Sequence, residues 1–477
     1  MKTTIPEGAR APHFWEAMIS LMSLVIGISI SIVFYGLDPH IPMLLGVFVA
    51  SLVAMRCGFT WQNIQNGMVR GITNALPATI ILIVVGILIG VWILAGVVPT
   101  LIYYGLSFIS TSVFLPATLL ICAVTSLATG TSWGTTGTIG VALMGVGAGL
   151  GFPLPIVAGA VISGAYFGDK MSPLSDTTNM APALAGTDLF THIRHMSYTT
   201  GVSFGLTLII EIVLGLQYGG GEGDIERIAT MLKILDENFT INIVMLMPPL
   251  VVLFVSYRKM PAIPGITLGV VAAALIAVGL QGADYDALAN VAFGGYAAET
   301  GNADVDDLLS RGGMDSMMYT ISLVIVAMMF GGVMERTNQL KALADKILSM
   351  VKSDGGLIAA TAFTGIGSNM VLCDQYMSIV MGARTYSAAY RERGLAPENL
   401  SRAVEDSATV TANLVPWNSG GAYQTATLGV MTLAYLPFAF FCWLSPIVTI
   451  LFGYMGWTIN RIEPQTEQQT AATAPAE

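Results

Sequence analysis

One stretch of 98 consecutive residues, from Gly71 to Gly168, contains no Asp, Glu, Lys or Arg. A bilayer core needs only about 20 apolar residues for each helix that crosses it, so this stretch holds several membrane spans joined by neutral turns. The apolar runs are long and do not alternate in polarity, whereas the strands of a transmembrane barrel do. The sequence therefore predicts an all-α polytopic membrane protein.

The composition of the chain agrees with this prediction. Of 477 residues, 54% are hydrophobic and 10% are charged, against about a quarter charged in an ordinary soluble domain. The net charge of −10 comes without a basic stripe, which excludes nucleic acid as a partner. The first apolar run is too long for a signal-peptide core and is expected to remain as the first span. The cysteines have no metal-ligand spacing and are interpreted as packing residues: Cys57, Cys122, Cys373 and Cys442.

Hydrophobic runs predict where the chain crosses the bilayer. The predicted spans are 14–36, 40–55, 75–96, 113–129, 196–217, 240–257, 263–281, 314–334 and 430–455. Two further segments, 58–74 and 335–352, have polar faces and are predicted to be interfacial or hairpin-like.

The orientation of these spans follows from the short loops that hold Lys and Arg, because cytoplasmic loops have an excess of both. The basic loops lie at Arg56 and Arg70, at His192 to His195, at Arg258 and Lys259, and from Arg336 to Lys352. The acidic segments 222–237 and 284–307 then fall outside the cell. Both termini are therefore predicted to lie on the cytoplasmic side of the bacterial inner membrane.

A weak internal repeat divides the chain into two halves. Residues 95–98 align with 331–334, and Ser132 aligns with Ser368, at an offset of 236, while Pro173 and Pro416 lie 243 apart. Span 75–96 is predicted to run outward and its partner 314–334 inward, so the repeat is inverted, as in many secondary transporters. The predicted parts are a first repeat (1–217), an external acidic connection (218–239), a second repeat (240–461) and a disordered cytoplasmic tail (462–477).

Four polar segments interrupt the apolar pattern, at 130–137, 168–181, 365–375 and 405–421. Pro173 and Pro416 are predicted helix breaks, which free carbonyls that can replace the hydration shell of a small cation. Sodium prefers oxygen ligands, as harder metal ions do. The predicted cation ligands are the hydroxyl and amide side chains of these segments: Thr131, Ser132, Ser172, Ser175, Thr177, Thr178, Asn179, Ser368, Asn369, Asn413, Asn418 and Ser419. Trp133 and Trp417 are predicted to wall the cavity, with interfacial packing as the alternative.

Carboxylates are rare in these segments, and a charged side chain at a helix centre in the bilayer costs at least roughly 2.5 kcal/mol. The predicted proton and cation carriers are Asp169, Asp176, Asp374, Glu405 and Asp406. A buried carboxylate holds either a proton or a metal ion, and competition between them is sufficient to couple their movement. Structural alternatives remain for each: Asp169 can pair with Lys170, Asp176 can cap a helix, and one of Glu405 and Asp406 can lie at an aqueous edge. Glu211 and the potential anion-binding residue Arg384 are secondary candidates.

No catalytic set competes with a transport site. His13, His40, His192 and His195 are all expected at loop or terminal positions, and no nucleophile motif, phosphate loop or metalloprotease spacing is present. We therefore expect no enzyme activity and no cofactor. Because the chain has no nucleotide-binding loop, we expect its transport to be driven by an ion gradient. A channel remains a third possibility, beside the two types of exchanger described below.

Several of these motifs resemble one family. The run from Gly164 to Thr178 resembles the signature of the NhaC-type sodium/proton antiporters, and the blocks at 130–135, 373–375, 405–407 and 416–418 look like that family's other blocks in the same order. The resemblance spans nearly the whole chain and implies inverted repeats, a scaffold part and a transport part, a homodimer, and exchange of Na+ for H+. Some relatives exchange malate for lactate with sodium and protons, and others move amino acids. Ala408 and Ser419 to Gly421 depart from residues common in the family, so a small carboxylate or an amino acid stays open as an alternative substrate.

Overall fold

The computed structural model describes residues 5–218, 223–258 and 260–462. Within these ranges the chain is helical, and the sole β pairing is an isolated bridge between Leu395 and Arg461. Seven of the described helices are long and apolar enough to cross a membrane, or up to nine if two bent pairs each count as one span. The predicted all-α polytopic membrane fold is confirmed. Lys259 and residues 463–477 of the predicted tail lie outside the described residues.

The helices before the long acidic segment include seven of at least 12 residues and three shorter ones. They are α1 (Phe14–Ser29), α2 (His40–Arg56), α3 (Trp61–Leu94), α4 (Val97–Phe108), α5 (Thr111–Thr129), α6 (Ser132–Thr135), α7 (Val141–Gly149), α8 (Leu154–Met171), α9 (Asp176–Ala185) and α10 (Leu189–Tyr218). Turns of π-helix extend α1 over Ile30–Phe34 and join α6 to α7 over Thr136–Gly140.

The remaining helices show a similar mixture of long and short elements. They are α11 (Gly223–Asn238), α12 (Met247–Tyr257), α13 (Ala262–Leu280), α14 (Tyr285–Gly294), α15 (Ala303–Leu309), α16 (Met318–Arg336), α17 (Gln339–Ser349), α18 (Asp354–Leu372), α19 (Gln375–Glu392), α20 (Pro397–Val404), α21 (Ser419–Leu428), α22 (Thr432–Tyr435) and α23 (Phe440–Met455). A π-helical turn, Glu405–Thr409, follows α20.

Helix α3 corrects one prediction. Residues 58–74 are not a separate interfacial segment, because a single helix of 34 residues runs from Trp61 to Leu94. At about 1.5 Å per residue it is roughly 51 Å long, well beyond a hydrocarbon core of about 30 Å. Its polar first turns remain helical because buried positions recur every three or four residues, at Ile64, Gly67, Gly71 and Ala75, and α3 packs along α16.

The last predicted span is also wrong in detail. Residues 430–455 do not form one straight helix, since the segment Thr432–Phe438 is bent by 57° from Phe440–Met455. Pro437 lies at the bend, and proline removes a helical hydrogen-bond donor.

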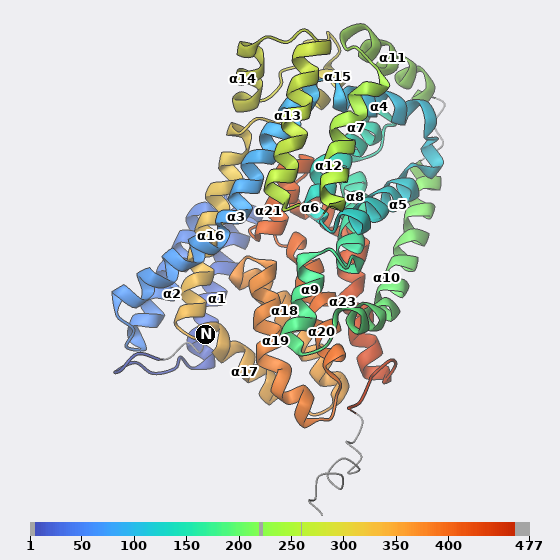
Figure 1. The fold of residues 1–477 in the computed structure, drawn as a ribbon. Coiled ribbons are helices and arrows are strands. Elements are labelled where there is room, and N and C mark those ends of the chain that lie inside the picture. Colours follow the sequence, from blue (N-terminus) through green and yellow to red (C-terminus); the bar gives the residue numbers. More distant parts are fainter. Residues whose placement is uncertain (1–4, 219–222, 259, 463–477) are drawn as a thin grey trace, which may run out of the picture.

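The fold has two distinct ends (Figure 1). Helices α11, α14 and α15 gather at one end, and the amino terminus, α17 and α19 lie at the opposite end. The short helices α6, α9 and α21 lie between them. Among the helix pairs, α5 packs against α8, α3 against α16, and α1 against α2. Breaks in the chain are thus concentrated in the interior.

Element boundaries recur 243 residues apart around the breaks. Helices α5 and α18 begin at Thr111 and Asp354, and each ends before a residue with positive φ, Gly130 and Cys373. Helices α9 and α21 likewise begin and end 243 residues apart. The offset of 236 is therefore wrong: Ser132 follows a break, whereas Ser368 lies inside α18 before one. A four-residue sequence match was too short to set the register.

Candidate functional site

The interior contains two places where one helix break lies against another. In the first half, Gly130 (φ +72°) follows α5, and a Cβ atom placed on it would lie 2.7 Å from the Leu174 carbonyl carbon in the break between α8 and α9. Ser172 Oγ also donates to Leu127 O at 2.8 Å. In the second half, the Ser419 N–H at the start of α21 donates to Cys373 O at 2.9 Å. Each half therefore brings the polar ends of four helical segments together.

Asp169 is the carboxylate of the first crossing. It lies in the last turn of α8 and is 4% exposed. Ser132 Oγ, on α6, donates to Asp169 Oδ2 at 2.6 Å. The predicted ligand Ser132 and the predicted carrier Asp169 are thus in direct contact.

Lys170 pairs with a carboxylate of the other half. Its side chain is fully buried, its ammonium forms an ion pair with Asp406, and it donates to Ser445 Oγ at 2.9 Å. Asp406 also accepts hydrogen bonds from Thr199 (2.7 Å) and Thr449. The alternative in which Lys170 pairs with the adjacent Asp169 is therefore wrong, because α8 directs the two side chains to different partners. The negative charge of Asp406 is compensated in this conformation.

Glu405 is different from its neighbour Asp406. It is fully buried, and neither of its carboxylate oxygens has a hydrogen-bond partner among the described residues. The nearby hydroxyls are those of Thr177 and Thr409, and the charges of Lys170 and Asp169 act on it. Both Glu405 and Asp406 belong to the π-helical turn after α20, a distortion often found at functional sites. The aqueous-edge alternative is wrong for both residues, because both are fully buried.

The charges of this group do not balance. Asp169, Glu405 and Asp406 supply three carboxylates, whereas Lys170 supplies one ammonium group. Isolated charges are very costly in a medium of low dielectric constant. The group is therefore stable with up to two further monovalent positive charges, whether these are protons or bound cations.

Two predicted carriers lie outside this group. Asp374 is the N-cap residue of α19, where Oδ1 accepts from the Met377 N–H at 2.9 Å, and it is 8% exposed. Asp176, in the first turn of α9, is exposed. The expectation of a buried carboxylate is thus wrong for Asp176, because its side chain lies on the exposed face of α9 while Ser175 and Thr177 beside it are buried. Its charge still acts on Asp169.

Many of the predicted ligands stabilise the breaks themselves. Thr131 Oγ1 accepts from the Gly134 N–H, Thr178 Oγ1 donates to the carbonyls of Asp169 and Lys170, and Asn418 Oδ1 accepts from the Gly420 N–H. Asn179 is exposed and donates to Pro173 O and Ser175 O. Ser175 and Thr177 share a hydrogen bond of 3.1 Å. Oxygens without a partner in the described ranges remain on three predicted ligands: Ser368, Asn369 and Asn413.

The two predicted wall tryptophans have different surroundings. Trp133 stacks on Tyr423, with ring centroids 4.2 Å apart and planes 10° apart. Trp417 instead donates from Nε1 to Met370 O at 2.8 Å, which braces the second crossing. Pro173 and Pro416 both lie between helices, in the breaks before α9 and α21.

Several site residues were not predicted. Tyr166 and Gln424 are buried, and Tyr166 contacts both Gln424 and Trp133, but none of these contacts has the geometry of a full hydrogen bond. Gln424 follows the polar segment 405–421 closely, and Tyr166 lies within the run from Gly164 to Thr178, so the sequence carried a usable signal at both positions. Ser445 and Thr449 are isolated hydroxyls in an apolar span, and Thr199 is one of several hydroxyls between Ser197 and Ser203. Only the fold therefore reveals their contacts with Lys170 and Asp406.

The loop positions predicted for His192 and His195 are wrong, since both are buried in the first turns of α10. His192 Nδ1 lies 2.8 Å from Ser401 Oγ, so packing against α20 buries this end of α10. Of the secondary candidates, Glu211 is buried on α10 with both oxygens unpartnered among the described residues, and Arg384 is exposed on α19.

Comparison with known proteins identifies a family model that matches most of the chain. The model of the Na+/H+ antiporter family matches residues 13–165 and 164–457. The Na+/H+ antiporter NhaC of Alkalihalophilus pseudofirmus is 41% identical over 452 residues, which cover 94% of this chain and 97% of that protein.

Other relatives have different named substrates. The malate-2H+/Na+-lactate antiporter of Bacillus subtilis is 38% identical over 94% of this chain and 96% of that protein. The arginine/ornithine antiporter ArcD of Halobacterium salinarum is 34% identical over 98% of this chain and 97% of that protein. Among solved structures, Neisseria gonorrhoeae MtrF aligns over 94% of this chain and 96% of that chain with a TM-score of 0.40 and 13% identity.

Proposed function

Because the chain belongs to the Na+/H+ antiporter family, we propose that it is a secondary active transporter that exchanges sodium for protons across the cytoplasmic membrane. Membership of this family indicates a transporter rather than an enzyme. Sodium and protons are the transported ions, and the described residues contain no group of three or more His, Cys, Asp or Glu that could hold a resident metal ion.

The observation that favours this function most is the state of Glu405. A carboxylate that is fully buried and has no hydrogen-bond partner in the described structure is stable when it is protonated or when a cation binds it. Asp169 lies close enough for its charge to act on Glu405. We assign the two carboxylates as the pair for which sodium and protons compete.

Exchange follows from competition at this pair. When sodium binds, the hydroxyls of Ser132, Thr177 and Thr409 and the two carboxylates offer oxygen ligands, and the carboxylates lose their protons. When protons return, the positive charge of sodium is no longer balanced and the ion leaves. An empty, doubly ionised pair is costly in the apolar interior, which disfavours a conformational change without cargo and so couples the two fluxes.

Lys170 and Asp406 are proposed to position this pair. Their ion pair joins α8 to the π-helical turn after α20, and Thr199 and Thr449 add contacts from α10 and α23. The arrangement keeps the Lys170 charge near Glu405 without a direct hydrogen bond to it.

The membrane arrangement is also a proposal. We infer two inverted repeats, 1–217 and 240–461, joined by an external connection at 218–239, with both termini in the cytoplasm of a bacterial cell and a homodimer as the assembly. The gathering of acidic α11, α14 and α15 at one end and of the amino terminus and α17 at the other supports this orientation.

Exchange of an organic substrate is the second candidate function. Relatives named as malate/lactate and arginine/ornithine antiporters are similar over nearly the whole chain, and a cavity with an arginine, described below, favours a carboxylate.

Proteoliposomes with an imposed pH gradient test the main proposal. Wild-type protein is expected to move protons when sodium is added, whereas Asp169→Asn and Glu405→Gln are each expected to reduce this flux at least about tenfold, equivalent to about 1.4 kcal/mol. Glu392→Gln, at an exposed position of α19, is the matched control and should transport normally. Unchanged flux in both Asp169→Asn and Glu405→Gln would remove the carrier assignment, and absence of sodium-dependent flux in active wild-type protein would remove the function.

A further inference from the structure

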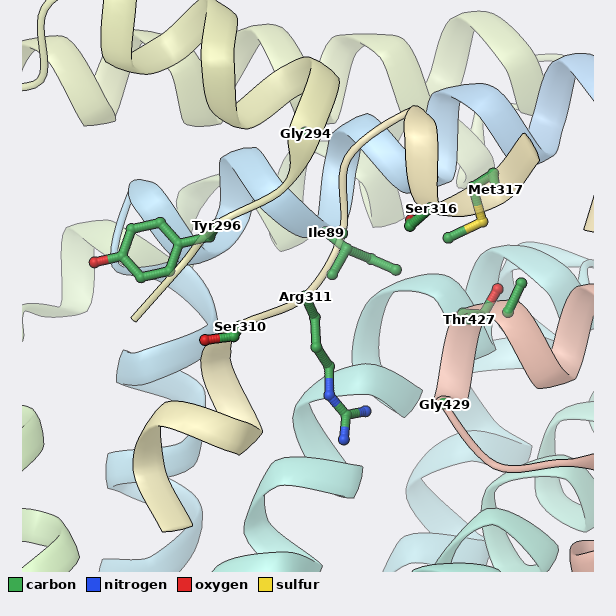
Figure 2. Close-up of a pocket in the computed structure, with 11 residues that line it drawn as sticks. Ile89, Gly294, Tyr296, Ser310, Arg311, Ser316, Met317, Thr427 and Gly429 are labelled. Carbon is green, nitrogen blue, oxygen red and sulfur yellow. The ribbon is translucent and has the colours of Figure 1, made fainter. Parts of the chain in front are cut away.

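A cavity of about 440 Å³ opens near the end of the molecule that contains α14 and α15. Its walls come from α3, from the loops on either side of α15 and from the end of α21. The polar lining residues include Tyr296, Ser310, Arg311, Ser316 and Thr427 (Figure 2). The cavity does not include Asp169, Glu405 or any other predicted carrier.

Among the described residues that line this cavity, Arg311 is the only one with a cationic side chain. Its side chain extends from the loop after α15 into the space between α15 and the end of α21, where Thr427 and Gly429 lie (Figure 2). One guanidinium nitrogen donates to Leu428 O at 3.2 Å. In the described residues no carboxylate lies within ion-pair distance of Arg311, although the charge of Asp307 acts on it.

The guanidinium group of Arg311 therefore has hydrogen-bond donors that no described residue uses. Arginine has five N–H donors in a planar fork that matches a carboxylate, and the bond to Leu428 uses one nitrogen. Arg311 is half-buried, and this partial burial lowers the pKa of its guanidinium group from the ordinary value. A half-buried cation that lacks an ion-pair partner is stabilised by an anionic ligand through charge-assisted hydrogen bonds.

A line of polar side chains leads inward from this cavity along α21. Thr427 lines the cavity, is 3% exposed, and its hydroxyl has no hydrogen-bond partner in the described structure. Gln424 and Gly420 lie three and seven positions earlier, on the same face of the helix. Gln424 is fully buried, and neither its amide oxygen nor its amide nitrogen has a partner among the described residues.

The same line continues to the carrier group. Tyr166 interacts with Gln424 and Trp133, and the charge of Asp169 acts on it. The Tyr166 hydroxyl and Trp133 Nε1 are also buried, and the contacts of Tyr166 with Trp133 and Gln424 lack the geometry of a full hydrogen bond. Buried polar groups normally make well-formed hydrogen bonds, so this series of weakly paired groups between Arg311 and Asp169 is suited to a polar solute that moves past them.

We propose that the cavity around Arg311 binds a small carboxylate anion and is the entrance to a route along α21 toward Asp169. The proposal rests on the proposed transport function and names the class of its co-substrate. Arg311 repels a free cation, so the cavity is an unsuitable first site for sodium alone. A single guanidinium charge matches one carboxylate group, and the hydroxyls of Thr427 and Ser316 suit the hydroxyl group of a 2-hydroxy acid.

A purely structural role for Arg311 gives different results. A cation at a helix C-terminus stabilises it by about 0.3–1 kcal/mol, and the bond to Leu428 O is such a contact. If Arg311 only caps the helix, wild-type protein should show no saturable anion binding at this cavity. Arg311→Gln would then lower the melting temperature and leave anion binding unchanged.

The test is a calorimetric titration of the purified full-length protein with L-lactate and, separately, with L-malate. Sodium concentration and ionic strength are held constant. Wild-type protein should bind at least one of them saturably, and Arg311→Gln should bind it about 10- to 100-fold more weakly, the effect of a charge-assisted hydrogen bond. Arg311→Lys, which keeps the charge but loses the fork, should bind with intermediate affinity, and Thr427→Val should bind several-fold more weakly. Lys233→Gln, an exposed cation on α11 at the same end, is the control and should bind as wild type does.

Three results would overturn the inference: no saturable binding of either acid by wild-type protein, equal binding by Arg311→Gln, or competition by chloride as effective as that by lactate. If Arg311→Gln does not fold, Arg311→Lys and Thr427→Val decide the question. Sodium-dependent proton flux is measured on the same preparations. Flux without acid binding would retain the proposed function and remove this inference, whereas acid binding without sodium-dependent flux in wild-type protein would do the reverse.

Discussion

At the scale of single residues, Lys170 and Asp406 show how a charged pair is held within a membrane protein. Both side chains are fully buried, and Ser445, Thr199 and Thr449 use their remaining hydrogen-bonding capacity. Removal of one partner of a buried ion pair leaves an uncompensated charge, which typically costs about 3–5 kcal/mol. Removal of both partners leaves no such charge.

We therefore expect Lys170→Met to lower the melting temperature of the purified protein markedly, and Lys170→Met/Asp406→Leu to recover much of that loss. Thermal unfolding in detergent measures both, with Lys341→Met as the control, because Lys341 pairs with Asp345 in an exposed i,i+4 position. If the double variant is less stable than the single one, the pair contributes net stability and the desolvation argument is wrong.

Substitutions of Asp374 can distinguish a role as a helix cap from a role as a proton carrier. Its side chain accepts from the Met377 N–H at the start of α19, and asparagine caps a helix about as well as aspartate. We expect Asp374→Asn to keep both stability and sodium-dependent proton flux, and Asp374→Ala to lose about 1 kcal/mol of stability. Loss of flux in a stable Asp374→Asn protein would instead support the sequence-based prediction that Asp374 carries cargo.

At the scale of helices, the site depends on close packing of α8 against α5. Helix α8 has Gly164 and Gly168 one turn apart on the side that faces α5, and a Cβ atom on Gly168 would lie 2.3 Å from Ala123 O. Small residues at this spacing allow membrane helices to approach each other closely. Asp169 follows directly, so its distance from Ser132 is set by this contact.

Gly168→Leu is expected to separate α8 from α5 and to lower both stability, by about 1–3 kcal/mol, and sodium-dependent proton flux. Gly201→Leu on α10 is the matched control, because nothing lies within 4 Å of a Cβ atom at that position. Thermal unfolding and proteoliposome flux are measured on both. Equal behaviour of the two variants would show that the α5–α8 contact does not position Asp169.

At the scale of the whole molecule, the orientation in the membrane is open to a direct test. The native cysteines Cys57, Cys122, Cys373 and Cys442 are all buried, so little background labelling is expected. Glu237→Cys on α11 should react with a membrane-impermeant maleimide in intact cells, whereas Lys352→Cys after α17 should react only after permeabilisation. The reverse pattern would invert the proposed orientation, and labelling of both from outside would contradict the assignment of the two ends to opposite sides.

The sequence by itself determined the class of fold, the family and the location of the breaks. Long uncharged apolar runs have few physical alternatives to membrane helices, and the polar segments at 130–137, 168–181, 365–375 and 405–421 correspond to interruptions between helices. The motif from Gly164 to Thr178 was sufficient to indicate the family that the comparisons show.

Only the tertiary structure decided which charges meet. Lys170 is 236 residues from Asp406 in the chain, and Thr199 and Thr449 reach the same carboxylate from two further helices. Local patterns describe what a segment buries but not its partners, so the sequence left Lys170 with Asp169 as a reasonable pair and gave equal weight to Glu405 and Asp406. The fold compensates the charge of Asp406 and leaves Glu405 without a hydrogen-bond partner in the described structure. That difference arises because each carboxylate faces different helices, and no single segment of the sequence contains that information.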